Sequence, residues 1–268
     1  MFNGDKLYMF PSAGSIQVMG FAMAGDGCVI GIDSASRDEA QKIEETLLGL
    51  GGKVDCWFFT HSHYDHIEGF VEIMRRGKVR VDSVCYAFPS LDYFKSVEPD
   101  DRIVRGVENY VAFEEQIKAH GVKVIKPQKG VYIKVGHFKV MPLSDGSAAG
   151  SRLNASSVVY RVQTRGDSVL FLGDMDWSAQ ERVLLEFPDE IKCPVVQMAH
   201  HGQDGVTEEF YRAVQPKVAL WCAPEWLWNN DCGNGFNTGP WKTVETRGWM
   251  EKLQTVNYRF QKEITVLE

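Results

Sequence analysis

Residues 60–66 read Thr60-His61-Ser62-His63-Tyr64-Asp65-His66, and this stretch decides the fold. The apolar run before it, residues 54–59, is rich in aromatic side chains and predicts a buried strand. Apolar residues at helical spacing follow it, namely Ile67, Phe70, Val71 and Met74. The cluster is therefore expected where a strand ends and a helix begins.

The side chains of this stretch favour a metal site. His61 and His63 are two positions apart on extended backbone and can send both imidazoles to one side, whereas Asp65 and His66 turn away at the helix entrance. This geometry suits two neighbouring metal ions better than one. The alternative, a pH-sensitive patch of loop residues, leaves the density of good ligands unexplained.

The pattern His-x-His-x-Asp-His in residues 61–66 resembles the signature of the metallo-β-lactamase superfamily. Short predicted strands with helices in both halves favour by themselves only an α/β or α+β fold. The resemblance implies the more specific four-layered αββα sandwich, in which two sheets pack face to face with helices outside. At 268 residues the chain is long enough for one such domain over residues 1–268.

Further candidate ligands follow two later predicted strands. Asp174 comes after the strand at residues 168–172, and Ala199-His200-His201-Gly202 comes after the strand at residues 194–198. The resemblance implies that metal one is held by His61, His63 and Asp174, and metal two by Asp65, His66, Asp174 and one of the pair His200-His201. We favour His201 as this ligand and His200 as the neighbour that contacts substrate or leaving group. The resemblance also implies that Asp33 supports the ligands by hydrogen bonding.

One departure from many superfamily members is informative. Lactamases and glyoxalase-like thioesterases carry a further metal-one histidine upstream of the bridging aspartate, but no histidine lies between His137 and His200. His137 itself is expected to face solvent from a strand. The region instead contains Asn154-Ala155-Ser156-Ser157, and Asn-x-x-Ser followed by Gly-Asp and His-His-Gly resembles the branch of the ComEC DNA-uptake nuclease domain and the phosphorylcholine esterase. This resemblance implies a phosphoesterase whose metal one has fewer protein ligands.

The expected chemistry is metal-dependent hydrolysis. Imidazoles with carboxylates suit two divalent ions, zinc above all, with manganese or iron as alternatives. Such a centre attracts anions and makes water nucleophilic near neutral pH. We predict hydrolysis of a phosphate mono- or diester, with Asp65, Asn154 and His200 as catalytic residues and His200 as the candidate general acid. The alternatives are a lactonase or lactamase-like acyl hydrolase and a metal-binding domain without turnover.

The net charge, the apolar runs and the cysteines of the chain indicate which kinds of partner and compartment to expect. A formal charge of −7 argues against a broad basic face for nucleic acid, so a small anionic phosphoester is the expected partner. The sequence shows neither a leader pattern nor an apolar run of membrane-spanning length, which predicts a soluble cytoplasmic protein with no membrane contact. Six cysteines without a CxxC pair are typical of a reducing compartment.

Two segments leave alternatives open. Trp221, Trp226, Trp228, Phe236 and Trp241 crowd one region. They either cover a sheet edge or form a homodimer contact, or they build a substrate wall beside His201 with Asp231 or Glu225 assisting. Residues 90–101 are expected to be irregular, and residues 103–117 to form a helix that is either an insertion near the site mouth or a surface helix.

Overall fold

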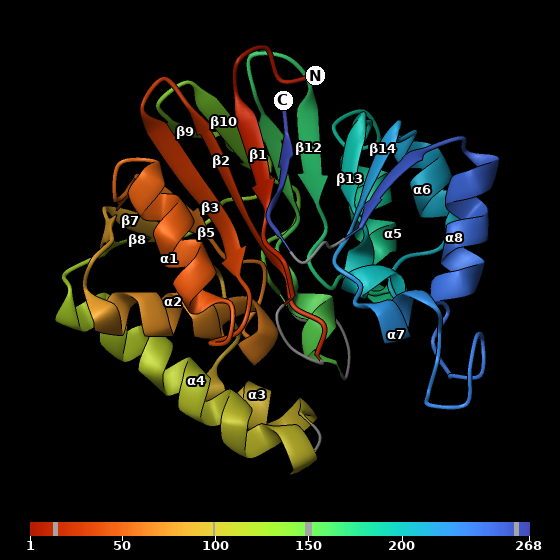
Figure 1. Cartoon of the computed structure of the whole chain (residues 1–268), viewed down its shortest axis with the longest axis horizontal. Helices are drawn as coiled ribbons and strands as arrows, with labels where there is room; N and C mark the ends of the chain where they lie inside the picture. The colour runs from red at the N-terminus through yellow and green to blue at the C-terminus, as the bar shows by residue number, and fades with distance from the viewer. Residues whose placement is uncertain (13–15, 99, 148–151, 260–262) are drawn as a thin grey trace.

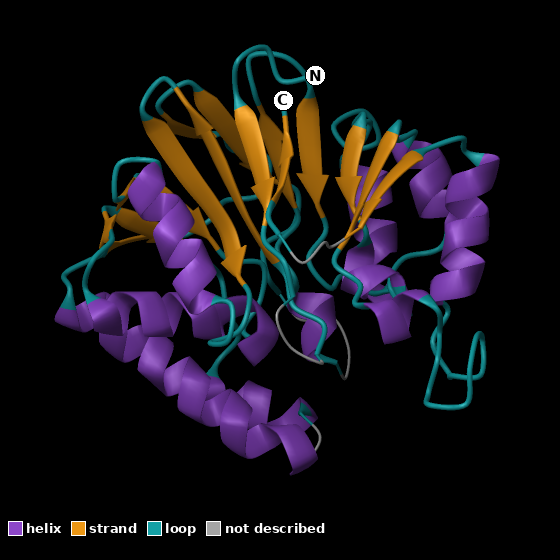
Figure 2. Cartoon of the chain, in the orientation of Figure 1, coloured by secondary structure: helices purple, strands orange, loops and turns teal. Residues whose placement is uncertain are grey.

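A computed structural model describes residues 1–12, 16–98, 100–147, 152–259 and 263–268 (Figure 1). Within these residues, two seven-stranded sheets pack face to face, and helices cover their outer faces (Figure 2). The order of layers is helix, sheet, sheet, helix. The chain therefore has the four-layered αββα fold of the metallo-β-lactamase type.

The first sheet holds the strands of the N-terminal half and the last strand of the chain. Its order is β16 (Thr265–Leu267), β1 (Lys6–Met9), β2 (Gly20–Gly25), β3 (Cys28–Ser34), β5 (Cys56–Phe58), β7 (Ser83–Cys85) and β8 (Lys123–Ile125). Pairing is antiparallel as far as β3 and parallel from β3 to β8. Its outer face carries α1 (Ala40–Gly49), α2 (Tyr64–Arg76) and α4 (Asp100–Ala119) (Figure 1).

The second sheet holds the C-terminal half. Its order is β15 (Val256–Arg259), β14 (Val218–Trp221), β13 (Val195–Gln197), β12 (Ser168–Phe171), β11 (Tyr160–Gln163), β10 (Phe138–Pro142) and β9 (Ile133–Val135). Strands β12 to β15 are parallel, so their carboxyl ends meet at one edge. The helices on this side are α5 (Trp177–Glu186), α6 (Glu208–Val214), α7 (Glu225–Trp228) and α8 (Thr243–Lys252).

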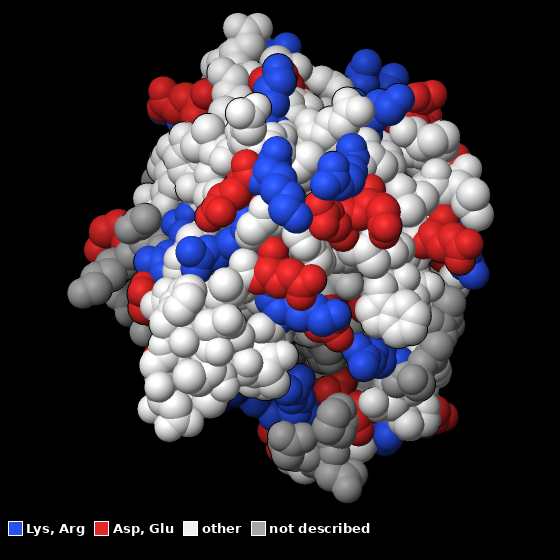
Figure 3. Space-filling view, turned by 90° about the vertical axis from the view of Figure 1, so that its right-hand side faces the viewer, with Lys and Arg blue, Asp and Glu red and all other residues white. Residues whose placement is uncertain are grey.

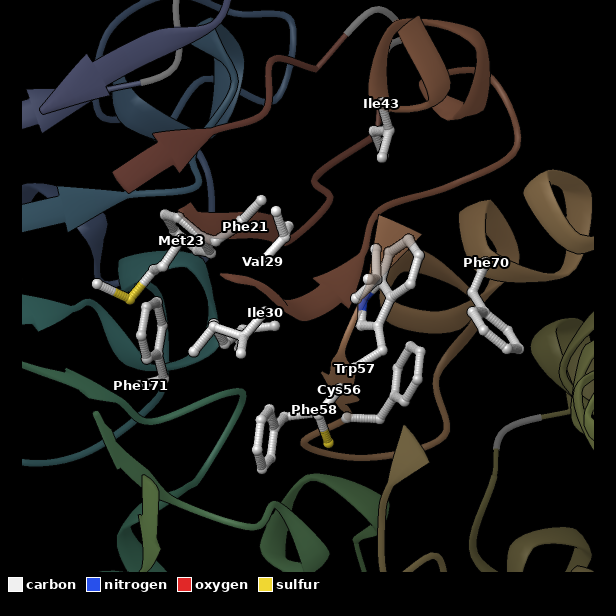
Figure 4. Packing of buried hydrophobic residues seen from close by; sticks show 14 of the residues in the cluster. Phe21, Met23, Val29, Ile30, Ile43, Cys56, Trp57, Phe58, Phe70 and Phe171 are labelled. Atoms are coloured by element: carbon white, nitrogen blue, oxygen red, sulfur yellow. The ribbon is translucent and has the colours of Figure 1, made fainter. Parts of the chain in front are cut away.

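Side chains on the two faces of β5 explain why this strand is buried throughout. Phe58 points to the second sheet, where its ring meets Tyr160 edge-on with centroids 5.3 Å apart. Trp57 points to the other face and meets Phe70 of α2 at 5.4 Å (Figure 4). Because helices and a second sheet cover opposite faces, both alternating sets of residues are apolar. This burial fixes the end of β5, from which the candidate ligands follow.

Several predicted elements differ from the structure. Residues 54–59 form two strands, because the chain turns at Asp55, whose carboxylate accepts the Val29 N–H at 2.9 Å. β4 (Lys53–Val54) consequently pairs with β6 (Arg80–Val81), outside both large sheets. Residues 90–101 were expected to be irregular, but α3 (Leu91–Val97) occupies them, with Ser90 capping its first turn; residue 99 lies outside the described residues.

The expectation for His137 is also wrong. His137 lies in the turn between β9 and β10, and its Nε2 is 2.8 Å from Oδ1 of the buried Asp5. The ring, which is 22% exposed, therefore satisfies a buried carboxylate from a turn and faces solvent only in part. The expected pairing of Ser36 with Glu39 before α1 is confirmed, since the Glu39 carboxylate accepts the Ser36 hydroxyl at 2.6 Å and the Ser36 N–H at 3.1 Å.

The surface charges, the helix composition and the state of the cysteines can be described directly. Basic and acidic side chains are interspersed on the face drawn in Figure 3. Among the described residues, none of the helices combines the length and the apolar character needed to cross a bilayer. All six cysteines are free; Cys232 is exposed and the other five are buried.

We predict that Gly69→Ala destabilises the fold. Gly69 lies in α2 where a methyl group would overlap the carbonyl oxygen of Ser34, so β3 and α2 would have to separate. Overpacking of this kind lowers the free energy of unfolding by about 2 kcal/mol or more. Urea denaturation in the presence of a chelator measures the change without a contribution from bound metal.

Gly248→Ala is the matched control for this prediction. Gly248 is also helical, but among the described residues no atom outside its own stretch of helix backbone lies within 4 Å of the added methyl group. This substitution should raise the free energy of unfolding by about 0.5–1 kcal/mol through helix propensity. Equal effects of the two substitutions would contradict the proposed close packing of α2 on β3.

Candidate metal centre

The predicted ligands come from three strand ends that lie together. His61, His63, Asp65 and His66 follow β5 and open α2, Asp174 follows β12, and His200 and His201 follow β13 in the turn Ala199–Gly202. In Figure 1 the arrows of β12 and β13 point to the same edge of the sandwich. Residues more than a hundred positions apart in the sequence thus meet at this edge.

Asp174 lies at the centre of the cluster. Its Oδ1 is 3.3 Å from Nε2 of His66, and its Oδ2 is 3.6 Å from Nε2 of His201 and 3.9 Å from Nε2 of His61. Asp65 completes the group, since its Oδ2 is 3.4 Å from Nε2 of His201. These five residues are all buried, so the groups meet away from bulk water.

Two overlapping groups of residues could each hold an ion. Among the described residues, His61, His66 and Asp174 form one, and Asp65, His66 and His201 form the other. Within each group the ligand atoms lie within 4.8 Å of one another. His63 adjoins the first group through His61, with Nδ1 of His63 2.8 Å from Nε2 of His61. The assignment of each ligand to metal one or metal two stays a prediction.

On each histidine of the cluster, the ring nitrogen that points away from Asp174 makes a hydrogen bond, and this bond shows which nitrogen carries the ring proton. Nδ1 of His66 faces the Asp33 carboxylate at 2.7 Å, Nδ1 of His201 faces the Cys222 carbonyl at 3.0 Å, and Nδ1 of His200 faces the Asp204 carbonyl at 3.2 Å. These oxygens only accept, so we assign the ring proton to each of these nitrogens. The opposite nitrogen, Nε2, is then left with a lone pair directed into the cluster.

The same reasoning assigns the ring protons of His61 and His63, to Nδ1 of His61 and to Nε2 of His63. Thr60 donates its hydroxyl proton to Asp33 at 2.7 Å, so its oxygen accepts from Nδ1 of His61 at 3.1 Å. Nε2 of His63 is 2.8 Å from the Glu98 carboxylate and therefore donates to it. Nε2 of His61 and Nδ1 of His63 are thus two lone pairs facing each other. The predicted support from Asp33 is present as hydrogen bonds to both His66 and Thr60.

When these rings are neutral, the cluster contains acceptors without donors. Within the described chain, Nε2 of His66, Nε2 of His201 and Oδ1 of Asp174 are buried and have no hydrogen-bond partner. Buried acceptors of this kind are unfavourable unless a cation satisfies them. Imidazole nitrogens and carboxylate oxygens are the donor set that zinc, manganese and iron accept. The residues present therefore fit a centre for divalent metal ions.

The electrostatics support the same conclusion. Burial lowers the pKa of His201, but the carboxylates of Asp174 and Asp65 outweigh it and raise the pKa to about 9. Burial raises the pKa of Asp174, but His201 and His66 overcome this and hold it well below its usual range. The site thus attracts positive charge strongly, whether as protons or as metal ions.

Local backbone features bring the loop after β12 against the loop after β5. Gly173 has φ 57°, and a methyl group on it would lie 2.7 Å from Cβ of Thr60. The buried amide of Gln197 accepts the N–H groups of Leu172 and Gly173 at 2.8 and 2.9 Å and donates to the Gly173 carbonyl at 3.1 Å. Only glycine allows this approach, and Gln197 fixes the turn that carries Asp174.

The two histidines of the Ala199–Gly202 turn have unusual backbone conformations. His200 has φ 48° and His201 has φ 55°, both in the left-handed region that is unfavourable for side chains with a Cβ. The His200 N–H donates to the Gly173 carbonyl at 3.0 Å, which ties this turn to the one carrying Asp174. Strain of this kind is concentrated at functional sites.

Asn154 and His200 lie together beside the cluster. Nδ2 of Asn154 is 3.1 Å from Nε2 of His200, which is 3.9 Å from Oδ2 of Asp174. Asn154 lies in a single 3-10 turn, Leu153–Ser156, before β11. The structure thus brings these two predicted catalytic residues to the site, while their catalytic roles stay predictions.

Glu98 is a residue of the site that the sequence did not indicate. It follows α3, in the segment expected to be irregular, and its side chain is 3% exposed. A carboxylate 35 positions after His63 belongs to no recognisable pattern. Only the packing of α3 against the site shows the contact.

The aromatic segment is largely packed. Trp221 is fully buried and meets Trp228 with ring centroids 5.1 Å apart, and Trp226 meets Trp241 at 4.8 Å, whereas Phe236 is 62% exposed. These contacts agree with rings that cover the sheet. The homodimer contact and the substrate wall stay predictions, with the Asp231 carboxylate accepting from N–H groups of its own loop and Glu225 pairing with Arg259.

The fold and the site together define a class of protein. Residues 17–222 match the sequence profile of the Metallo-beta-lactamase superfamily, which is more than half of the chain. The chain belongs to this superfamily, most of whose members are hydrolases.

Comparison with particular proteins refines the placement. The chain is 27% identical over 169 residues to ComE operon protein 3 of Bacillus subtilis (strain 168), which supports the ComEC-like branch; the match spans 63% of this chain and 20% of that protein. The fold is similar to the metallo-beta-lactamase fold protein YhfI from Bacillus subtilis, with TM-score 0.57, 11% identity and coverage of 98% and 99% of the two chains. It is also similar to CmlA, a diiron beta-hydroxylase from Streptomyces venezuelae, with TM-score 0.58, 13% identity and coverage of 98% and 54%.

We predict that Asp174→Asn removes most of the bound metal. Asp174 is the carboxylate that approaches His61, His66 and His201 at once, and the amide removes its charge while keeping its shape. Elemental analysis after dialysis against zinc should show about two ions per wild-type chain and less than one in the variant.

Asp176→Asn is the control for this prediction. Asp176 is equally buried and two positions away, but its carboxylate caps α5 by accepting the Ser178 N–H at 3.0 Å. Asparagine is also a good N-cap, so this variant should keep its metal. Full retention of metal by Asp174→Asn would contradict the central position of this residue.

Proposed function

We propose that this protein is a metal-dependent hydrolase of phosphate mono- or diesters. The observation that carries the proposal is the arrangement of Asn154 and His200 beside Asp174, where many superfamily members have a further histidine ligand. Fewer protein ligands and two polar side chains suit a substrate with several anionic oxygens. Two divalent ions, held by the residues around Asp174, would supply a nucleophilic water near neutral pH and stabilise negative charge.

The protein groups fit the handling of an anionic substrate. Nδ1 of His200 is held by the Asp204 carbonyl, so Nε2 is the atom that faces substrate. Burial lowers the pKa of His200, while Asp174 partly offsets it, so the ring is neutral before substrate binds. A bound phosphate ester would favour the charged ring, and His200 would then hold a proton at Nε2 for the leaving oxygen. Asn154 holds the neutral ring by donating from Nδ2 to Nε2, and its amide would turn so that Oδ1 accepts once Nε2 carries a proton.

The proposal also covers the identity of the metal and the cellular compartment of the protein. We propose zinc as the resident ion because imidazole and carboxylate donors suit it, with manganese and iron as the alternatives that elemental analysis of purified protein decides. A protein with free cysteines, most of them buried, is suited to the cytoplasm. The proposed partner is a small anionic phosphoester, for which the positively charged metal centre supplies the attraction.

Turnover assays with metal-loaded protein test the reaction class. The substrates are bis-p-nitrophenyl phosphate, p-nitrophenyl phosphate, a lactone and nitrocefin. We expect hydrolysis of at least one phosphate ester and none of nitrocefin. Hydrolysis of the lactone or nitrocefin alone would establish an acyl hydrolase instead, and metal binding without any turnover would leave a metal-binding domain.

We also predict that His200→Gln lowers kcat for the phosphate ester by about 10²- to 10⁴-fold, the usual contribution of a general acid or base. The metal content should remain near that of the wild type, because His200 is proposed to act on substrate. His137→Gln is the control, since His137 pairs with Asp5 and should leave kcat unchanged. If His200→Gln lost metal as well as activity, His200 would have to be reassigned as a ligand.

A further inference from the structure

Glu98 makes an unusual contact with the metal centre. Its Oε2 is 2.8 Å from Nε2 of His63, and its side chain is only 3% exposed. His66 directs its outer nitrogen to the carboxylate of Asp33 in β3. His61, His200 and His201 direct theirs to a hydroxyl or to backbone carbonyls close to β5, β13 and β14. Glu98 instead comes from the helical segment between β7 and β8.

This contact decides which nitrogen of His63 carries the ring proton. A carboxylate only accepts, so Glu98 retains the proton on Nε2 and leaves Nδ1 with a lone pair. Nδ1 lies 2.8 Å from Nε2 of His61, which also has a lone pair because Thr60 holds the His61 proton on Nδ1. Two lone pairs at this distance repel each other unless a cation lies near both.

The other tautomer of His63 would have the opposite effect. With the proton on Nδ1, His63 would donate a hydrogen bond to Nε2 of His61 across the same 2.8 Å. That bond would occupy the lone pair of His61 and leave His63 without one on this side, so neither ring could bind metal there. Glu98 therefore decides whether His61 and His63 are available as two metal ligands or form a hydrogen-bonded pair that cannot bind metal there.

The position of Glu98 is well supported by its own segment. Its backbone N–H donates to the Phe94 carbonyl at 3.0 Å, and Phe94 is buried against Gly106 of α4. The Tyr110 hydroxyl of α4 donates to the Pro89 carbonyl at 2.9 Å, just before α3. The carboxylate is thus held in place by the packing of α3 on α4.

We propose that Glu98 is a positioning residue of the metal centre, which fixes the tautomer and orientation of His63 so that Nδ1 is a ligand atom. The proposal rests on metal binding by the cluster, but it does not depend on which ester is hydrolysed. It also assigns a role to the segment from α3 to α4, whose packing holds Glu98 against His63.

Metal titration of the whole chain tests the proposal. The protein is stripped with a chelator and titrated with Co²⁺, whose visible spectrum reports the ligands, and with Zn²⁺ against a competing indicator. Glu98→Met, which keeps the bulk but not the acceptor, should weaken one of the two metal-binding events by about 10- to 100-fold. Glu98→Gln should lose less, because its amide oxygen still accepts from Nε2 of His63.

Two further variants separate positioning from folding. Glu114→Met removes a carboxylate of the same segment that accepts from the Tyr86 hydroxyl, and it should leave both metal-binding events unchanged. In a His63→Ala background, Glu98→Met should cause no additional loss of affinity. Nitrogen NMR of the metal-free protein should show the His63 proton on Nε2 in the wild type and moved to Nδ1 in Glu98→Met.

The outcomes distinguish this inference from the proposed function. If the wild type binds two ions and Glu98→Met binds both with unchanged affinity, the role of Glu98 is wrong whatever the reaction. An equal loss in Glu98→Met with or without His63 would show that Glu98 acts on folding alone. If the wild type binds no metal, the proposed hydrolase function fails as well.

Discussion

The buried acceptors around Asp174 are the constraint on which the rest of the structure depends. His61, His66, His200 and His201 direct Nε2 towards Asp174, three of these rings are fully buried, and the described residues supply no donor for Nε2 of His66, Nε2 of His201 or Oδ1 of Asp174. Such a group of atoms is unfavourable by several kcal/mol unless cations occupy it. A fold that maintains it therefore has to fix each ring from behind, and the outer hydrogen bonds do so.

The sandwich supplies this rigidity through its packing. The rings of Phe58 and Tyr160 meet between the sheets, and the Tyr160 hydroxyl donates to the Phe59 carbonyl just before the first ligands. Gln197 ties the end of β12 to the end of β13. Because the two sheets are joined directly at the edge that holds the site, the loops cannot move apart without loss of core contacts.

The supports of the ligands differ in origin, and this difference has consequences for function. Most outer nitrogens are bonded to groups at strand ends, which belong to the common sandwich. Asn154 and Glu98 instead come from the Leu153–Ser156 turn and from the end of α3, which lie on connections between strands. Connections vary most freely within a fold, so they are the natural place for differences in metal occupancy and substrate among relatives.

The first half of the site was predictable from the sequence because its signal is local. His61, His63, Asp65 and His66 share one strand-to-helix junction, and the periodicity on either side shows where that junction lies. Asp174 and the His200-His201 pair also follow apolar strands, so their order along the chain predicted the remaining positions. The αββα layering came from the resemblance, since strand and helix patterns alone leave the pairing of sheets open.

Other features required the tertiary structure. The break at Asp55, the helix at residues 91–97 and the pairing of His137 with Asp5 depend on contacts between distant segments, which no local period encodes. The same holds for Glu98 and for the ring protons. The sequence by itself determined which residues can bind metal and where their strands end. Only the tertiary structure decided which nitrogen of each ring faces the cluster, because that choice depends on an acceptor brought from elsewhere in the chain.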